Sequence, residues 1–193
     1  ILYIDHVGMS KVEGSYISIS NHASRLDYIF TGIPPLPNLM NYVAGYNEFH
    51  RFHLSLVFRL LHVIPKKNFV PDIYTIKEIL RVLKAGSSIC IFPEGMSSIS
   101  GANQPVAIGT GKLIKKAKLP VYYSVIRGGY LTSPKYNLRD RCGRVEVEVD
   151  QLFTAEQIET EFGKRVAELV LSETENKRAD FPADATWELR KQE

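Results

Sequence analysis

The chain has 193 residues, of which 45% are hydrophobic and 23% charged, and its formal net charge is +3. These values allow one globular domain with a sizeable core, and so small a positive charge does not indicate a nucleic-acid partner. No apolar run approaches the roughly 18 residues of a membrane-spanning helix, and no signal peptide is visible. We expect the chain as given to be soluble and cytoplasmic, which suits its two cysteines, Cys90 and Cys142. A membrane anchor upstream of Ile1 stays open.

The first predicted elements alternate between strand and helix. Tyr16 to Ser20 alternates in polarity and predicts a strand, and Ser24 with Asp27 predicts the start of a short helix. A proline-rich loop then leads to a strand over Leu39 to Ala44.

A longer helix is predicted from Asn47 to His62, with a narrow polar stripe that includes Arg51 and Arg59. The remaining surface of this helix is apolar and too broad to be exposed to water. Two interpretations are open: the surface packs into the core, or it dips into a bilayer surface and admits a lipid.

The rest of the chain continues the alternation. The predicted elements are a helix over Asp72–Lys84, a strand over Ser88–Phe92, a helix over Ala107–Ala117, strands over Val121–Ile126 and around Val145–Val149, and a last helix capped by Thr154 and Gln157. Alternation of this kind predicts an α/β fold in a single domain, with a mostly parallel central sheet flanked by helices. We place the domain at residues 1–172 and a charged C-terminal tail at residues 173–193.

Two polar clusters follow predicted strands of this sheet. His22 and Asp27, with four residues between them, follow the first strand, and Glu94 with Gly95 follows the strand that ends at Phe92. Ligands bind outside the carboxyl ends of the strands in such sheets, so both clusters belong to one edge.

The chemistry of these residues suits transfer of an acyl group to a hydroxyl. A hydroxyl needs a base to remove its proton as it attacks, and a histidine held by a carboxylate is such a base. We therefore assign His22 as the base and Asp27 as its orienting partner. Glu94 can orient the acceptor hydroxyl, and Gly95 permits a tight turn close to a ligand.

The sequence blocks Asn21-His22-Ala23-Ser24-Arg25-Leu26-Asp27 and Phe92-Pro93-Glu94-Gly95 resemble the first and third blocks of the glycerolipid acyltransferase family, over roughly residues 10 to 130. The resemblance implies direct transfer from acyl-CoA or acyl carrier protein to a lysophospholipid such as 1-acylglycerol-3-phosphate, without an acyl-enzyme. It also implies no metal and no cofactor beyond the donor, and work at the cytoplasmic face of a membrane.

Two positions depart from the pattern of that family. Lys66 and Lys67 stand in the second block, where an arginine commonly meets the acceptor phosphate, so these lysines are candidates for that contact. The third block continues with Met96 and Ser97 rather than threonine and arginine, and Ser97 is a further candidate for substrate binding. An acceptor other than glycerol phosphate is therefore an alternative.

Rival interpretations are weaker. Gly95-Met96-Ser97-Ser98-Ile99 lacks the second glycine of a hydrolase nucleophile elbow, and Gly109-Thr110-Gly111-Lys112 lacks the remaining residues of a nucleotide-binding loop. His50 and His53 have no carboxylate or cysteine to complete a metal site. A lipid-binding module without turnover remains as an alternative from another class, although such a module needs no positioned base.

Overall fold

The structure is a computed structural model that describes residues 2–7, 14–36, 38–50, 58–59, 62–67, 70, 72–102, 104–107, 109–135 and 141–160. Its strands are β1 (Leu2–Val7), β2 (Ile17–Ser20), β3 (Met40–Gly45), β4 (Ile64–Lys66), β5 (Ser88–Ile91), β6 (Val121–Arg127) and β7 (Gly143–Phe153). Its helices are α1 (Asp27–Gly32), the 3-10 helix η1 (Tyr46–His50), α3 (Ile73–Lys84), α4 (Gly109–Ala117), α5 (Gly129–Thr132) and α6 (Ala155–Thr160).

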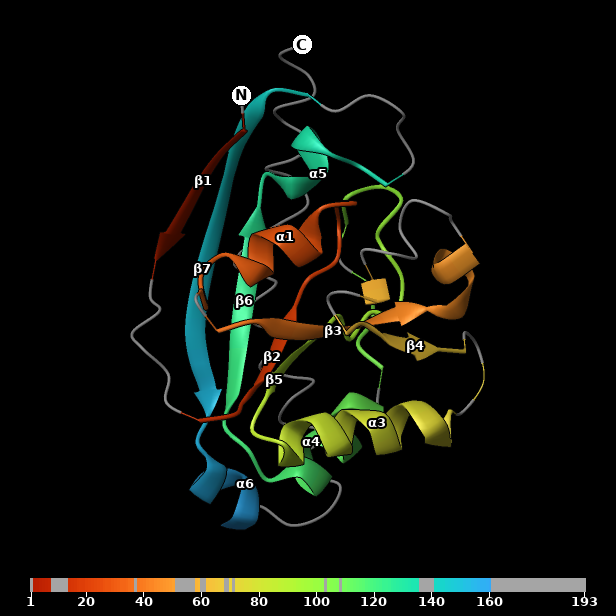
Figure 1. Cartoon of the computed structure of the whole chain (residues 1–193). Helices are drawn as coiled ribbons and strands as arrows, with labels where there is room; N and C mark the ends of the chain where they lie inside the picture. Colours follow the sequence, from red (N-terminus) through yellow and green to blue (C-terminus); the bar gives the residue numbers. More distant parts are fainter. Residues whose placement is uncertain are drawn as a thin grey trace.

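The described strands form one sheet in the order β1-β7-β6-β2-β5-β3-β4 (Figure 1). All neighbours from β6 to β4 pair in parallel, whereas β7 runs antiparallel to β6 and carries β1 on its outer edge. The predicted α/β fold with a mostly parallel sheet is confirmed. The strands β1 and β4 were not predicted, because neither has enough alternating residues to stand out in the sequence.

The strand order brings the two polar clusters together. β2 and β5 are direct neighbours, with Ile19 opposite Ile91. Because parallel strands end at the same edge, the loops that follow β2 and β5 emerge side by side. His22 lies two residues after β2 and Glu94 three residues after β5.

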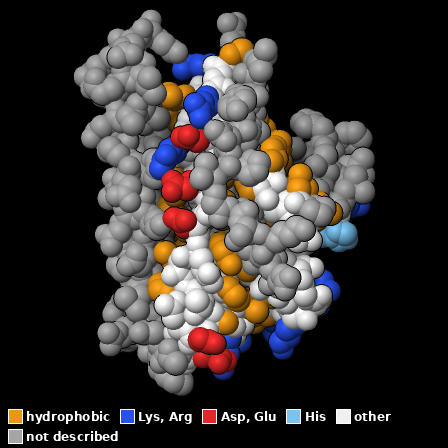
Figure 2. Space-filling view, turned by 90° about the vertical axis from the view of Figure 1, so that its left-hand side faces the viewer, with side chains coloured by type: hydrophobic (Ala, Val, Ile, Leu, Met, Phe, Trp, Pro, Cys, Tyr) orange, Lys and Arg blue, Asp and Glu red, His pale blue; other side chains and the backbone are white. Residues whose placement is uncertain are grey.

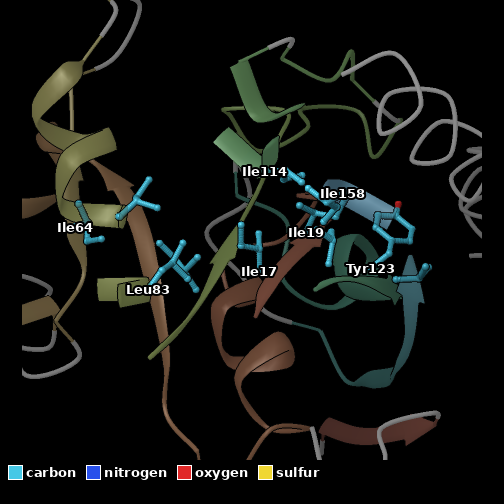
Figure 3. Packing of buried hydrophobic residues seen from close by; sticks show 11 residues of the cluster. Ile17, Ile19, Ile64, Leu83, Ile114, Tyr123 and Ile158 are labelled. Carbon is cyan, nitrogen blue, oxygen red and sulfur yellow. The ribbon is translucent and has the colours of Figure 1, made fainter. Parts of the chain in front are cut away.

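One face of the sheet carries an aliphatic core. Alternate residues of β2, β5 and β6 point to this face, where α3, α4 and α6 cover them. In Figure 3, Ile114 of α4 and Ile158 of α6 lie against Ile19 and Tyr123 of the sheet. This packing holds the strands in register and therefore sets the positions of the loops at the carboxyl edge.

The opposite face is more polar. Phe30 of α1 packs there on Ile126 and on valines of β7. Nearer β5 the buried layer contains Cys90, whose thiol interacts with the Thr31 and Ser18 hydroxyls, and burial raises the pKa of that thiol to about 12. The side chain of Cys90 is therefore a core group, as expected from its apolar strand, and not a reactive thiolate.

The capping box is confirmed: the Thr154 amide donates to Gln157 Oε1 at 2.8 Å, and the Gln157 amide donates to Thr154 Oγ1 at 3.2 Å. The glycine-containing segment that resembled a nucleotide loop is the start of α4 at Gly109. The first helix begins at Asp27 rather than at Ser24, because the Asp27 carboxylate binds the Ser24 amide before the helix starts.

The predicted helix from Asn47 to His62 lies largely outside the described residues. Its first residues form the 3-10 helix η1 instead of an α-helix. Phe49 packs edge-to-face on the buried Phe58, with ring centroids 5.2 Å apart, so this aromatic side chain faces the core. Phe52 and the remainder of the apolar surface are outside the described part, as are residues 161–193 with the predicted tail.

The outer side of the sheet near β7 is charged. Arg127 of β6 pairs with Glu146 and Glu148 of β7, with nitrogen–oxygen distances of 3.6 and 2.7 Å. Figure 2 shows acidic and basic side chains in one column on this side of the molecule. Exposed pairs of this kind contribute little to stability, but they favour one register of β6 against β7. Among the residues described, none of the helices has the length and apolar character needed to cross a bilayer.

Candidate active site

The loop after β2 is fastened to the neighbouring strand by Asn21. Its side-chain amide donates to the carbonyl of Ile126 at 3.0 Å, and the amide of Ile126 donates to Asn21 Oδ1 at 2.8 Å. The Asn21 side chain thus continues the hydrogen-bonding pattern between β2 and β6 after β2 itself has ended. Sequence reasoning assigned Asn21 no separate role, because its partner is 105 residues away. The double hydrogen bond fixes where the next residue, His22, leaves the sheet.

The predicted pair of His22 and Asp27 is present. His22 Nδ1 lies 2.7 Å from Asp27 Oδ2, and the same oxygen accepts hydrogen bonds from the amides of Ala23 at 2.8 Å and Ser24 at 2.9 Å. The chain therefore turns tightly around the Asp27 carboxylate before entering α1. The six residues from His22 to Asp27 suffice to build this geometry, which is why the spacing alone predicted it.

The hydrogen bonds of Asp27 determine the tautomer of His22. Oδ2 accepts from two backbone amides, so it is an acceptor whether the carboxyl group is ionised or protonated at its other oxygen. The Nδ1 atom of His22 must then carry the proton and donate it. In the neutral ring this leaves the lone pair on Nε2, pointing away from Asp27, where a base needs it.

The Asp27 side chain is almost completely buried, with 1% of its surface exposed. Burial raises the pKa of its carboxyl group, and the hydrogen bonds and charge of His22 and the amides of Ser24 and Ala23 oppose that rise. No hydrogen-bond partner for Oδ1 lies among the described residues. A carboxylate this dry interacts strongly with an imidazolium, because little water screens the two charges.

Residues after β5 hold the other side of His22. The imidazole stacks on the ring of Phe92 with centroids 4.4 Å apart, and the backbone amide of His22 donates to Glu94 Oε1 at 3.0 Å. The amide of Ser98 donates in turn to the carbonyl of His22 at 2.7 Å. Gly95 completes the turn with a φ of +75°, and its amide donates to the Phe92 carbonyl at 3.0 Å. The two blocks therefore form one rigid unit.

Ser97 lies at the free nitrogen of this histidine. Its Oγ is 2.7 Å from His22 Nε2, and the residue is 1% exposed. Since Nδ1 carries the ring proton, the Ser97 hydroxyl is the donor in this hydrogen bond. The sequence placed Ser97 among the candidate site residues, but its contact with the imidazole appears only in the fold.

Lys66 and Lys67 lie at the same edge but further along the sheet. Both are exposed at the end of β4, and the amide of Lys67 donates to the helix-capping Asp72 at 2.9 Å. β4 is three strands from β2, so at about 4.8 Å a strand the backbones are roughly 14 Å apart. A lysine side chain from there must extend over β3 and β5 to approach a ligand at His22.

The described residues contain no group of three or more histidine, cysteine, aspartate or glutamate side chains arranged to hold a metal ion. Of the two histidines considered above as metal ligands, His50 contacts the ring of Tyr46, and His53 is outside the described part.

The fold and the site define an α/β domain with a carboxylate-held histidine at the carboxyl edge of its parallel strands. The sequence matches the model of the Acyltransferase family over residues 4–127, and the chain belongs to that family. Among solved structures it is similar to the 1-acyl-sn-glycerophosphate (LPA) acyltransferase PlsC from Thermotoga maritima, with a TM-score of 0.68 and 18% identity, over 91% of this chain and 71% of that chain. This likeness establishes the fold alone. No curated protein sequence matches the chain significantly.

Proposed function

We propose that this acyltransferase moves a fatty acyl group from acyl-CoA or acyl carrier protein to a hydroxyl of a lysophospholipid such as 1-acylglycerol-3-phosphate. His22 acts as the base, Asp27 orients it, and Glu94 with Gly95 shapes the place where the acceptor binds. The observation that carries this proposal is the imidazole of His22, whose Nδ1 is bound by Asp27 while its Nε2 meets a hydroxyl, each at 2.7 Å.

The electrostatics of the site support base catalysis. When His22 takes a proton it becomes an imidazolium, and the buried carboxylate of Asp27 stabilises that charge at a distance of 2.7 Å. The ring is 22% exposed, so a substrate can approach it from one side. The stack on Phe92 keeps the ring in place during the transfer, and the hydrogen bond from the His22 backbone amide to Glu94 keeps its main chain in place.

The identity of the acceptor is the finer part of the proposal. Lys66 and Lys67 supply positive charge at the correct edge of the sheet, which favours a phosphorylated lipid. Their distance from His22 suits the alternative, a lipid acceptor whose anionic group lies well away from the reacting hydroxyl, better than 1-acylglycerol-3-phosphate, in which these two groups are on adjacent carbons. Contact with the cytoplasmic face of a membrane follows from a lipid acceptor and belongs to the same proposal.

The test is a transfer assay with purified protein, read by mass spectrometry, in which CoA and carrier-protein donors are offered with several lysolipids. Wild-type protein should form a diacyl product, and His22→Ala should lower turnover by at least 10²-fold to 10⁴-fold. His50→Ala is the matched control, because His50 is exposed and its ring contacts Tyr46, and it should keep the wild-type rate.

Two results would contradict the proposal. Wild-type rates in His22→Ala would remove the assigned base. Binding of lysolipids without transfer from either donor would instead identify a lipid-binding module on the same scaffold.

A further inference from the structure

The free nitrogen of the base is already occupied by a hydroxyl of the protein. A neutral imidazole has one lone pair on Nε2, and Ser97 Oγ lies 2.7 Å from that atom. Nδ1 carries the ring proton, so Ser97 donates this hydrogen bond. An acceptor hydroxyl must come within hydrogen-bond distance of the same lone pair before the base can take its proton. The acceptor and Ser97 therefore compete for one position on His22.

Ser97 is held at this position and is itself shielded from ligands. The amide of Ser98 donates to the carbonyl of His22 at 2.7 Å, so the backbone beside Ser97 is joined to the backbone of the base. The side chain of Ser98 is held separately by the Ala102 carbonyl at 2.6 Å. Ser97 is only 1% exposed, whereas the side chain of His22 is 22% exposed. The Ser97 hydroxyl is therefore placed to cover the base rather than to meet the acyl donor.

An uncovered base exposes the acyl donor to a side reaction with water. A base that activates a lipid hydroxyl also activates water, which attacks the thioester and yields a free fatty acid and a thiol. The ring of His22 is partly exposed, so solvent reaches it when no acceptor is bound. Exclusion of water from the reacting centre prevents such hydrolysis. A protein hydroxyl at Nε2 keeps water from the lone pair while the site is empty.

We propose that Ser97 covers the base of the empty site and leaves it when an acceptor hydroxyl takes its place, so that this serine selects the lipid acceptor over water. This inference rests on the proposed acyl-transfer function and adds to it a residue that determines specificity. Transfer itself stays direct. The acceptor hydroxyl gives its proton to His22 Nε2 and bonds to the thioester carbonyl carbon, the carbon–sulfur bond breaks, and the leaving thiolate takes the proton from Nε2.

The exchange of one hydroxyl for another needs only a small movement. A serine side chain has three staggered χ1 rotamers, so rotation about one bond removes Oγ from Nε2 without a shift of the main chain. The acceptor hydroxyl then makes the hydrogen bond that Ser97 gives up, and contacts with the rest of the lipid supply the free energy for the displacement. Water has no such additional contacts. A bound lipid therefore displaces Ser97 more readily than a water molecule does.

The test compares consumption of the donor with and without an acceptor. Purified protein receives the donor that supports turnover in the assay above, and mass spectrometry follows free fatty acid and diacyl product. Wild-type protein without lysolipid should release fatty acid at a small fraction of its transfer rate. Ser97→Ala opens the lone pair to water. We expect fatty acid release to rise by about 10-fold or more, because water then gains part of the ~10²-fold to 10⁴-fold effect of base catalysis.

Further variants assign the effect to the contact between Ser97 and His22. Ser97→Ala combined with His22→Ala should release fatty acid only at the background rate, because the water molecule needs the base. Ser97→Thr restores a hydroxyl and should bring the release back toward the wild-type value, which a general loosening of the loop would not explain. Ser100→Ala is the control, because Ser100 is exposed on the same loop, and it should behave as wild type.

Three results would overturn the inference. Ser97→Ala could form diacyl product while releasing fatty acid no faster than wild-type protein, or the double variant could hydrolyse the donor as fast as Ser97→Ala. Wild-type protein could also hydrolyse the donor without lysolipid at a rate comparable to transfer, a result that depends on no variant. The proposed function survives each of these results as long as wild-type protein acylates a lysolipid and His22→Ala does not, so the two failures are distinguishable.

Discussion

The backbone amide of His22 donates a 3.0 Å hydrogen bond to Oε1 of Glu94, a residue 72 positions later in the chain. This bond joins the loop after β2 to the loop after β5 at the level of the base itself. Glu94 therefore holds the main chain of His22, in addition to the acceptor-orienting role that we propose for it.

Replacement of Glu94 separates those two roles. Glu94→Gln keeps an acceptor for the His22 amide, so we expect wild-type stability together with lower kcat/KM for the acceptor. Glu94→Ala removes the acceptor and should lower the free energy of unfolding by about 1.5–3 kcal/mol, the usual range for a hydrogen bond to a charged group. Urea unfolding and steady-state kinetics measure the two effects. Equal loss of stability in both variants would show that the hydrogen bond from the His22 amide to residue 94 does not contribute to stability.

Asp27→Asn should reveal the free-energy cost of burying an ionised carboxyl group. Burial raises the pKa of Asp27 in the folded protein above its unfolded value of about 4. Between that value and the folded pKa, the folded protein retains a proton that the unfolded chain has released. Stability must therefore fall as pH rises through this window, and it is unaffected by Asp27 below pH about 4.

The asparagine variant lacks this titration. We expect the wild-type free energy of unfolding, relative to that of Asp27→Asn, to decrease from pH 4 upward, while the variant loses as much as ~10⁴-fold in turnover because its His22 tautomer is no longer enforced. Urea unfolding of both proteins at a series of pH values provides the comparison. A difference that increases with pH would mean that the pKa is lowered in the fold.

Asn21→Ala should damage both stability and activity. It removes the two hydrogen bonds to the backbone of Ile126, which together are worth about 1–3 kcal/mol, and releases the start of the His22 loop. Asn41→Ala is a suitable control, because Asn41 donates to the Ser88 carbonyl at 3.0 Å in another part of the sheet. Both variants should unfold at lower urea concentration, but kcat should fall only in Asn21→Ala. Unchanged kcat there would show that the loop is positioned without this residue.

Lys66→Ala and Lys67→Ala test the contact with phosphate. If either lysine meets the acceptor phosphate, its loss should raise KM for a phosphorylated lysolipid by about 10-fold to 100-fold and leave kcat nearly unchanged. KM for a neutral lysolipid should not change. Lys77→Ala controls for general surface charge, since Lys77 is exposed on α3. Equal effects on neutral and phosphorylated acceptors would assign the phosphate contact to other residues.

Local features of this protein could be predicted from the sequence with good accuracy. The strand ending at Ser20, the helix ending at Lys84 and the capping box at Thr154 all depend on residues within a few positions of one another. The same holds for His22 and Asp27, which are joined across a single turn. Features that depend on distant partners were missed or incompletely assigned, among them the antiparallel direction of β7 and the bond from Asn21 to Ile126.

The sequence by itself determined the alternation of strands and helices and the pairing of His22 with Asp27, because side-chain periodicity and short turns are properties of neighbouring residues. Only the tertiary structure decided what stands at the other nitrogen of the base. The arrangement of β2 beside β5 places Ser97 against His22 across 75 positions of sequence. Strand order results from the packing of both faces of the sheet, and no local pattern of residues encodes it.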